Sequence, residues 1–132
     1  MITDAEYRKI LEDGIRLFNE QKFFECHDKL EEAWKEVKHE KKKEAGSDPR
    51  RDFTHGIILL AVAYYHWRNK NQVGALRKYD NSMKLFAPYK GTFEGLDLAT
   101  LRRITKTQFE AYRKDPTRPF DPKTVPRLSL GS

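Results

Sequence analysis

Apolar residues recur every three or four positions through most of the chain, which is the spacing of amphipathic helices. The pattern predicts a first helix over about residues 4–18, a second from about 23 to 38 or beyond, and a third over about 50–68. A fourth helix ends before Pro88, and Asp97 is placed to cap a fifth. Because the third helix is apolar on every side, we expect it to lie in the centre of an all-α fold of about five helices.

An internal repeat relates the first two helices to the third and fourth. A shift of 49 residues aligns residues 18–27 with residues 67–76, so that the turn between the first two helices matches the turn between the third and fourth. The small residues Cys26 and Ala75 then occupy the matching position. The repeat predicts two helical hairpins, weakly similar to tetratricopeptide helix pairs, packed around the central apolar helix.

Length and proline placement divide the chain into a domain and an extension. With 132 residues, the chain is long enough to bury a modest core, and we expect one helical domain over residues 1–113. Prolines at positions 116, 119, 122 and 126 exclude a helix over residues 114–132. This proline-rich C-terminal extension is therefore expected to lie draped over the domain or to be loose.

Cysteine usage and hydropathy bear on the compartment. Cys26 is the single cysteine and can form no internal disulfide, and the first ten residues lack the apolar core of a signal peptide. The longest uncharged run, residues 53–67, is shorter than the roughly 20 residues that a bilayer span needs. We therefore expect a cytoplasmic (or organelle-stromal) protein without a membrane anchor.

A histidine and an acid on the second helix are the first candidates for chemistry. His27 and Glu31 are four residues apart and therefore neighbours on the helix surface. His27 lies about 40° from Phe23 on the edge of the apolar stripe, so it is expected to face inward. His55 and His66 share one face of the third helix but lie about 16 Å apart along its axis, so only one of them can join the pair.

Two histidines and one carboxylate would suit zinc, manganese or iron, with open positions for water. The primary metal candidates, which are also the catalytic candidates, are His27, Glu31 and His66, and the lower-ranked ones are His55, Glu25 and Asp28. The alternative is a buried hydrogen-bond network that fixes the register of the helices. A divalent transition metal is thus one possible cofactor, and the structural network needs none.

Other chemistries have less support. Cys26 and His27 are adjacent and diverge by about 100° on a helix, so they cannot form a thiolate–imidazole couple within it. The sequence has no P-loop and no GxGxxG run. A formal charge of +6 leaves nucleic acid as a weak option. The basic candidates for that contact are Lys41, Lys42, Lys43, Arg50, Arg51, Arg102 and Arg103.

Two sequence blocks resemble a known family. Residues 17–34 contain LFN, FFECHD, LE and W, and residues 56–76 contain GIILLAVA, HW, N and GAL. In this order they resemble the signature of domain-of-unknown-function family 309 over about residues 10–100. The resemblance implies a helical bundle in which Glu25, His27, Glu31 and His66 match characteristic positions, and it brings no established activity. His55 stands where the family usually has glutamine, which ranks it below His66.

Three hypotheses for the function follow. The leading one is a binding module that takes a small molecule or a protein partner at a buried His/acid pocket between the hairpins. The second is a metal-dependent, hydrolase-type enzyme that uses His27, Glu31 and His66. The third is a helical adaptor that grips a peptide in the groove between the hairpins, or that binds nucleic acid through its basic face.

Overall fold

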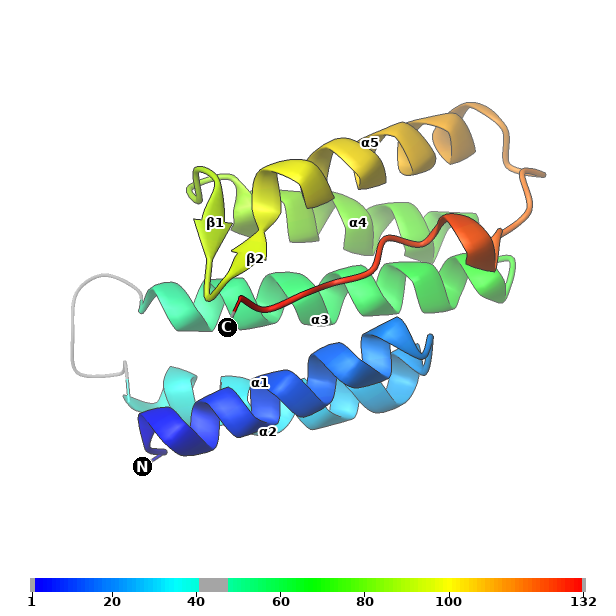
Figure 1. The fold of residues 1–132 in the computed structure, drawn as a ribbon. Coiled ribbons are helices and arrows are strands. Elements are labelled where there is room, and N and C mark those ends of the chain that lie inside the picture. The colour runs from blue at the N-terminus through cyan, green and yellow to red at the C-terminus, as the bar shows by residue number, and fades with distance from the viewer. Residues whose placement is uncertain (1, 41–47, 132) are drawn as a thin grey trace.

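A computed structural model describes residues 2–40 and 48–131 of the chain (Figure 1). Its helices begin and end close to the predicted positions. They are α1 (Asp4–Asn19), α2 (Phe23–Glu40), α3 (Pro49–Arg68), α4 (Gln72–Phe86) and α5 (Leu98–Lys114). The predicted all-α fold of about five helices is confirmed. Within the described residues, none of these helices combines the length and apolar character needed to cross a membrane.

Short polar side chains set where four of the helices begin. Thr3 and Glu6 form a capping box at α1, in which each side chain accepts a hydrogen bond from the other residue's backbone N–H at 3.0 Å. The side chains of Asp48, Asn71 and Asp97 accept backbone hydrogen bonds at the starts of α3, α4 and α5. Such caps satisfy N–H groups that have no partner within the helix. Asp97 therefore has the capping role that its position in the sequence predicts.

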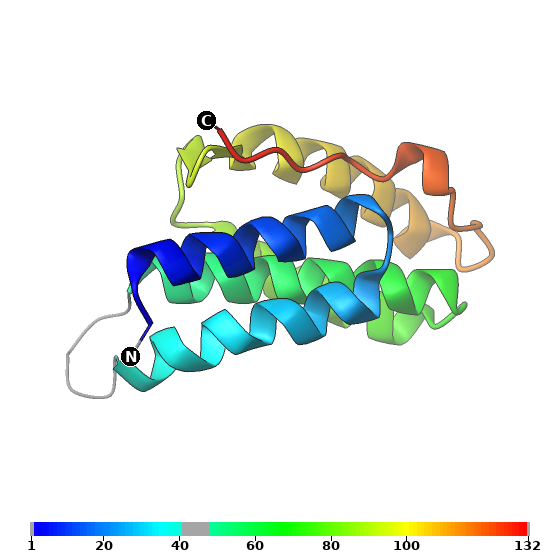
Figure 2. The ribbon, with the colours of Figure 1, turned by 60° about the horizontal axis from the view of Figure 1, so that its bottom comes forward.

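The central position of α3 organises the fold. It packs against α2 on one side and α4 on the other, while α1 packs on α2 and α5 packs on α4 (Figure 1). The hairpins α1–α2 and α3–α4 are those predicted from the internal repeat. The chain after α5 returns along the domain between α1 and α5, as both ribbon views show (Figure 2).

Aromatic rings from four helices meet at one residue of α3. Tyr64 is 1% exposed, and its ring centroid lies 6.0 Å from that of Phe18, 5.6 Å from Phe23 and 5.1 Å from Phe109. Trp67, one turn further along α3, stands 5.1 Å from Phe109. Rings at these separations pack well and add to the energy of area burial. The α1–α2 hairpin and α5 thus share one core with α3.

Small residues allow the helices to approach each other closely. The repeat-matched residues Cys26 and Ala75 are both fully buried. At Gly56 an added Cβ would lie 2.5 Å from the ring of Phe86, so this ring of α4 packs directly on the backbone of α3. The hydroxyl of Ser82 donates to the Gly56 carbonyl at 2.7 Å and ties the same two helices together.

A small β-hairpin between α4 and α5 was not predicted from the sequence. Its strands, β1 (Thr92–Phe93) and β2 (Leu96–Asp97), pair antiparallel. The connecting residues Glu94 and Gly95 both have positive φ, at 51° and 83°. The two strands are only two residues long, so the sequence offers no run of alternating residues to reveal them.

Residues 115–131, called the C-terminal tail below, lie against the domain. Helix was predicted to be absent over residues 114–132, but Lys114 is the last residue of α5 and Pro122–Thr124 form a 3₁₀ turn, η2. Leu128 is 2% exposed and belongs to the hydrophobic core, while most of the tail is exposed. Of the two predicted courses, the draped one is therefore the one observed.

Candidate functional site

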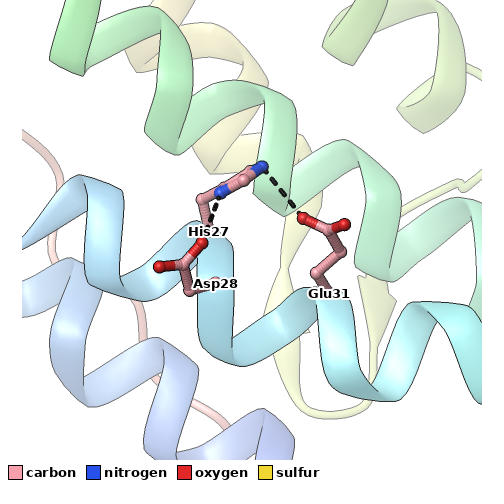
Figure 3. Close-up of side chains that lie close together, drawn as sticks. All are labelled: His27, Asp28 and Glu31. Carbon is pink, nitrogen blue, oxygen red and sulfur yellow. Dashed lines mark hydrogen bonds and ion pairs between the residues drawn. The ribbon is translucent and has the colours of Figure 1, made fainter.

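The predicted pair on α2 forms a cluster of three residues (Figure 3). His27 Nε2 lies 3.1 Å from an oxygen of Glu31, one turn further along the helix. On the other edge of the ring, Nδ1 lies 3.2 Å from an oxygen of Asp28. One ligand atom from each of the three side chains lies within 4.8 Å of the others, a separation that allows metal binding. Asp28, ranked low on the sequence, thus has a direct contact with His27.

The cluster lies at the surface, and the predicted buried His/acid pocket is wrong. The side chains of His27 and Glu31 are 29% and 31% exposed. Phe23 and Cys26 fill the buried positions of this turn, so a residue at the edge of the apolar stripe cannot also be enclosed. Glu25, another candidate, is exposed and lies about 160° from His27 on the helix.

The histidines of α3 do not join the cluster. His66 lies at the end of α3, where its Nδ1 is 3.5 Å from the Asn71 side-chain nitrogen. Burial lowers the pKa of His66, and the charge of Lys78 lowers it further. The ring of His55 packs on Trp34 with a centroid distance of 4.8 Å. The expected third member, His66 or His55, is therefore replaced by Asp28 among the described residues.

The two carboxylates face opposite edges of the imidazole, which limits what the cluster can do. An ionised carboxylate only accepts hydrogen bonds, so both contacts of His27 are satisfied together when both ring nitrogens carry a proton. A cation at Nε2 could replace one of these protons and bind Glu31 at the same time. One ion cannot be bound at both ring nitrogens, since their lone pairs diverge. The arrangement is a carboxylate–imidazole–carboxylate chain.

Aromatic residues border the cluster on one side. Phe24 is 51% exposed, and its ring centroid lies 5.8 Å from His27 and 5.7 Å from Tyr65 of α3. On the other side, the ammonium of Lys35 lies 3.3 Å from the second oxygen of Glu31. The cluster therefore has an apolar wall and a basic neighbour, and its remaining side is open to solvent.

The basic candidates are dispersed in the fold. Residues 41–43 lie outside the described residues. Arg50 is engaged by Asp48 at the start of α3, with a nitrogen–oxygen distance of 3.3 Å. Arg102 and Arg103 line a shallow cavity of about 550 Å³ between α4 and α5, which also contains Asp80. Arg50 and the pair Arg102–Arg103 thus lie on different helices, and a nucleic-acid contact stays a prediction.

A second candidate site is the groove between α1 and α5, in which the C-terminal tail lies. The side-chain nitrogen of Asn19 donates to the Leu128 carbonyl at 2.8 Å, and the Leu128 N–H donates to the Asn19 oxygen at 2.8 Å. One amide thus binds both backbone groups of one residue. Because Leu128 is 2% exposed, these bonds are shielded from water.

Two further side-chain amides hold the backbone of the tail. The Gln21 amide donates to the Pro122 carbonyl at 2.7 Å, from the turn that follows α1. On the opposite wall, the Gln108 amide of α5 donates to the Thr124 carbonyl. Both walls of the groove thus supply amide donors to the tail at its 3₁₀ turn η2.

The groove is wider than the tail that it holds. A cavity of about 550 Å³ on one side of the tail is lined by Ile15 and Asn19 of α1, among others. A smaller one of about 240 Å³ on the other side is lined by Leu101 and Ile104 of α5. Leu128 borders both cavities and is the deepest apolar anchor of the tail.

The sequence did not reveal the residues that hold the tail. The partners of Asn19 and Gln21 lie about a hundred residues further along the chain, so no local pattern marks these two residues. The prolines of the tail were the one available signal, since they indicate an extended segment whose backbone needs partners from elsewhere.

Comparison with known proteins gives a family match. The model of a family described as a domain of unknown function, DUF309, matches residues 11–78. The uncharacterised protein YpuF of Bacillus subtilis (strain 168) is 37% identical over 90 residues, which is 67% of this chain and 47% of YpuF. This chain thus spans about half the length of that relative. The family match includes His27, Glu31 and Asn19, and it ends before α5 and the tail.

Proposed function

Since the chain belongs to the DUF309 family, whose description states no activity, we propose from its own geometry that it is a helical adaptor that binds an extended peptide. The binding site is the groove between α1 and α5, which the C-terminal tail occupies in this structure. The proposal keeps the partner-binding function expected from the sequence and moves it from the His/acid cluster to the groove.

The observation that carries the proposal is the double hydrogen bond between Asn19 and the backbone of Leu128. Backbone groups are common to all residues, so an amide that binds both of them holds an extended chain without reading its sequence. The Gln108 amide supplies the same kind of bond from the opposite wall. A groove with such donors suits a peptide in trans as well as it suits the tail.

Specificity then comes from the apolar position in the groove that Leu128 fills. Leu128 is the tail residue that is buried, while Val125 and Leu130 are partly buried against the core. A partner segment therefore needs one large aliphatic side chain at the position of Leu128. Prolines nearby reduce the entropy lost when the segment becomes ordered, and the tail has Pro122 and Pro126 there.

In this account the C-terminal tail is a competitor within the same chain. A segment joined by a short linker has an effective concentration of about 1 mM or more at its own site, so it weakens the apparent affinity for a free peptide. The cavities beside the tail show that its packing leaves space on both sides. Partner binding is therefore expected to be weak until the tail is released.

A peptide with the sequence of residues 122–131 is the direct probe. In the full chain carrying Leu128→Asp, the tail should leave the groove, because a buried unpaired carboxylate is costly. The fluorescein-labelled peptide, followed by fluorescence polarisation, should bind this variant at least about 10-fold more tightly than it binds the wild-type chain.

Two controls define the outcome of this experiment. The same peptide carrying Leu128→Asp should not bind either chain, because its anchor is lost. The substitution Ser129→Asp in the full chain changes an exposed neighbour and should leave the low wild-type affinity unchanged. Equal peptide affinity for wild-type and Leu128→Asp chains would rule out the groove as a site that the tail occupies in competition.

We also propose a cytoplasmic or organelle-stromal location for the adaptor, as expected from the sequence. The support is chemical: Cys26 is fully buried, and burial raises the pKa of its thiol to about 12. A thiol in this state is protonated and unreactive, which suits a core residue in a reducing compartment. Localisation of the full chain fused to a fluorescent protein tests this directly, and secretion would contradict it.

A further inference from the structure

We propose that His27 and Glu31 form a surface site for a divalent transition metal, with Asp28 as the residue that orients the imidazole. This site is separate from the peptide groove, since all of its residues lie on α2, whereas the tail lies between α1 and α5. Its inner ligands are one imidazole nitrogen and one carboxylate, a combination found in zinc, manganese and non-haem iron sites.

The spacing of the two inner ligands fits a single ion. His27 Nε2 and the Glu31 oxygen are 3.1 Å apart. With metal–ligand bonds of about 2.1 Å on each side, that separation corresponds to an angle of about 95° at the ion. This angle lies close to the 90° of adjacent octahedral positions and below the tetrahedral value of about 109°. The separation of the two ligand atoms is therefore the one that a single ion requires.

The helix fixes this separation. Residues four apart face each other across one turn, so His27 and Glu31 need no contribution from loop conformation to meet. Phe24 packs beside the imidazole, with 5.8 Å between the ring centroids of Phe24 and His27, and Tyr65 of α3 packs on the Phe24 ring in turn. Folding thus already restricts the imidazole, and metal binding loses less side-chain entropy than it would with a freely rotating ligand.

Asp28 gives the imidazole the tautomer that metal binding needs. Its carboxylate lies 3.2 Å from Nδ1 and only accepts hydrogen bonds when ionised, so it favours the tautomer with the proton on Nδ1. With that proton held on Nδ1, the lone pair of Nε2 is directed to the ion. A carboxylate in this position raises the basicity of a metal-bound histidine, and its loss typically costs 10–100-fold in metal affinity.

Exposure leaves the ion with open positions. Glu31 is 31% and Asp28 62% exposed, so water completes the coordination. Lys35 binds the other oxygen of Glu31 at 3.3 Å, and this charge lowers the affinity for a cation without blocking the oxygen that faces His27. Metal-bound water at such a site is a Lewis-acid-activated group, which is the chemistry that the hydrolase hypothesis requires.

The test uses Zn²⁺ alone and the full chain. Isothermal titration at pH 7.5 should show one site in the wild type, with affinity lost in His27→Ala and reduced at least about 10-fold in Asp28→Ala. Glu25→Ala removes an exposed carboxylate of the same helix and should change nothing. Circular dichroism should confirm that all four proteins have the same helix content, since these side chains lie at the surface.

A second measurement identifies which imidazole nitrogen binds the metal. In nitrogen-15 NMR of the imidazoles, added Zn²⁺ should shift His27 Nε2 and leave Nδ1 protonated, while His55 and His66 stay unchanged. Equal Zn²⁺ affinity in the wild type and His27→Ala would overturn the site. Equal affinity in the wild type and Asp28→Ala would overturn the orienting role of Asp28.

Discussion

Substitution of Phe109 by alanine is expected to lower the free energy of unfolding by about 3–5 kcal/mol, because it removes a fully buried ring from the centre of the core. The Phe109 ring stacks on Tyr79 with a centroid distance of 4.4 Å and lies 5.1 Å from both Tyr64 and Trp67. No helix can move inward to fill such a cavity without breaking contacts elsewhere.

Urea unfolding followed by circular dichroism measures this effect as a lower midpoint at an unchanged slope. Thr107→Ala, an exposed change on the same helix, is the matched control and should lie within about 0.5 kcal/mol of the wild type. If Phe109→Ala were as stable as this control, α5 would not share the core. It would then also not be the fixed wall of the groove that the adaptor function needs.

Replacement of Asn19 by alanine should weaken peptide binding by about 10–100-fold, because it removes two shielded hydrogen bonds of roughly 0.5–1.5 kcal/mol each. The effect is best measured in the Leu128→Asp chain with the peptide of residues 122–131, where folding and tail docking do not interfere. The reason is local: the Leu128 N–H and carbonyl of the bound peptide would lose both partners that they have at 2.8 Å.

Asn81→Ala provides the control for this substitution. Asn81 is an exposed asparagine on α4, away from the groove, and its loss should leave the peptide affinity unchanged. Asn19→Gln keeps the amide but moves it by one methylene, so it should bind the peptide nearly as poorly as Asn19→Ala. If Asn19→Ala bound the peptide as tightly as the parent chain, the backbone clamp would not contribute to recognition.

The helices were predictable because their signals are local. Three- and four-residue spacing gave five helices, and short polar residues such as Asp97 gave their starts. The hairpin β1–β2 was not predictable, because each strand has only two residues and shows no alternating pattern. Its turn depends on the positive φ of Glu94 and Gly95. The course of the tail was not predictable either. Its prolines exclude a helix, but they do not indicate which surface of the domain the tail contacts.

The candidate site was predictable only within one helix. His27 and Glu31 meet because they are one turn apart, and that spacing is visible in the sequence. His66 was expected beside them, but its ring lies against Asn71 and Gly74 at the start of α4, and helix periodicity does not show which neighbouring helix a side chain meets. The clamp of Asn19 on Leu128 joins residues 109 apart, so it depends on the complete fold.

The most direct test of the adaptor is the contact between a free peptide and Asn19. Isotopically labelled Leu128→Asp chain, mixed with the unlabelled peptide of residues 122–131, should show intermolecular nuclear Overhauser effects from the peptide leucine at the Leu128 position to Ile15 and the Asn19 amide. That result would show the peptide in the groove in place of the tail. Binding with contacts elsewhere, or no change in the Asn19 amide signals at saturating peptide, would contradict the proposed function.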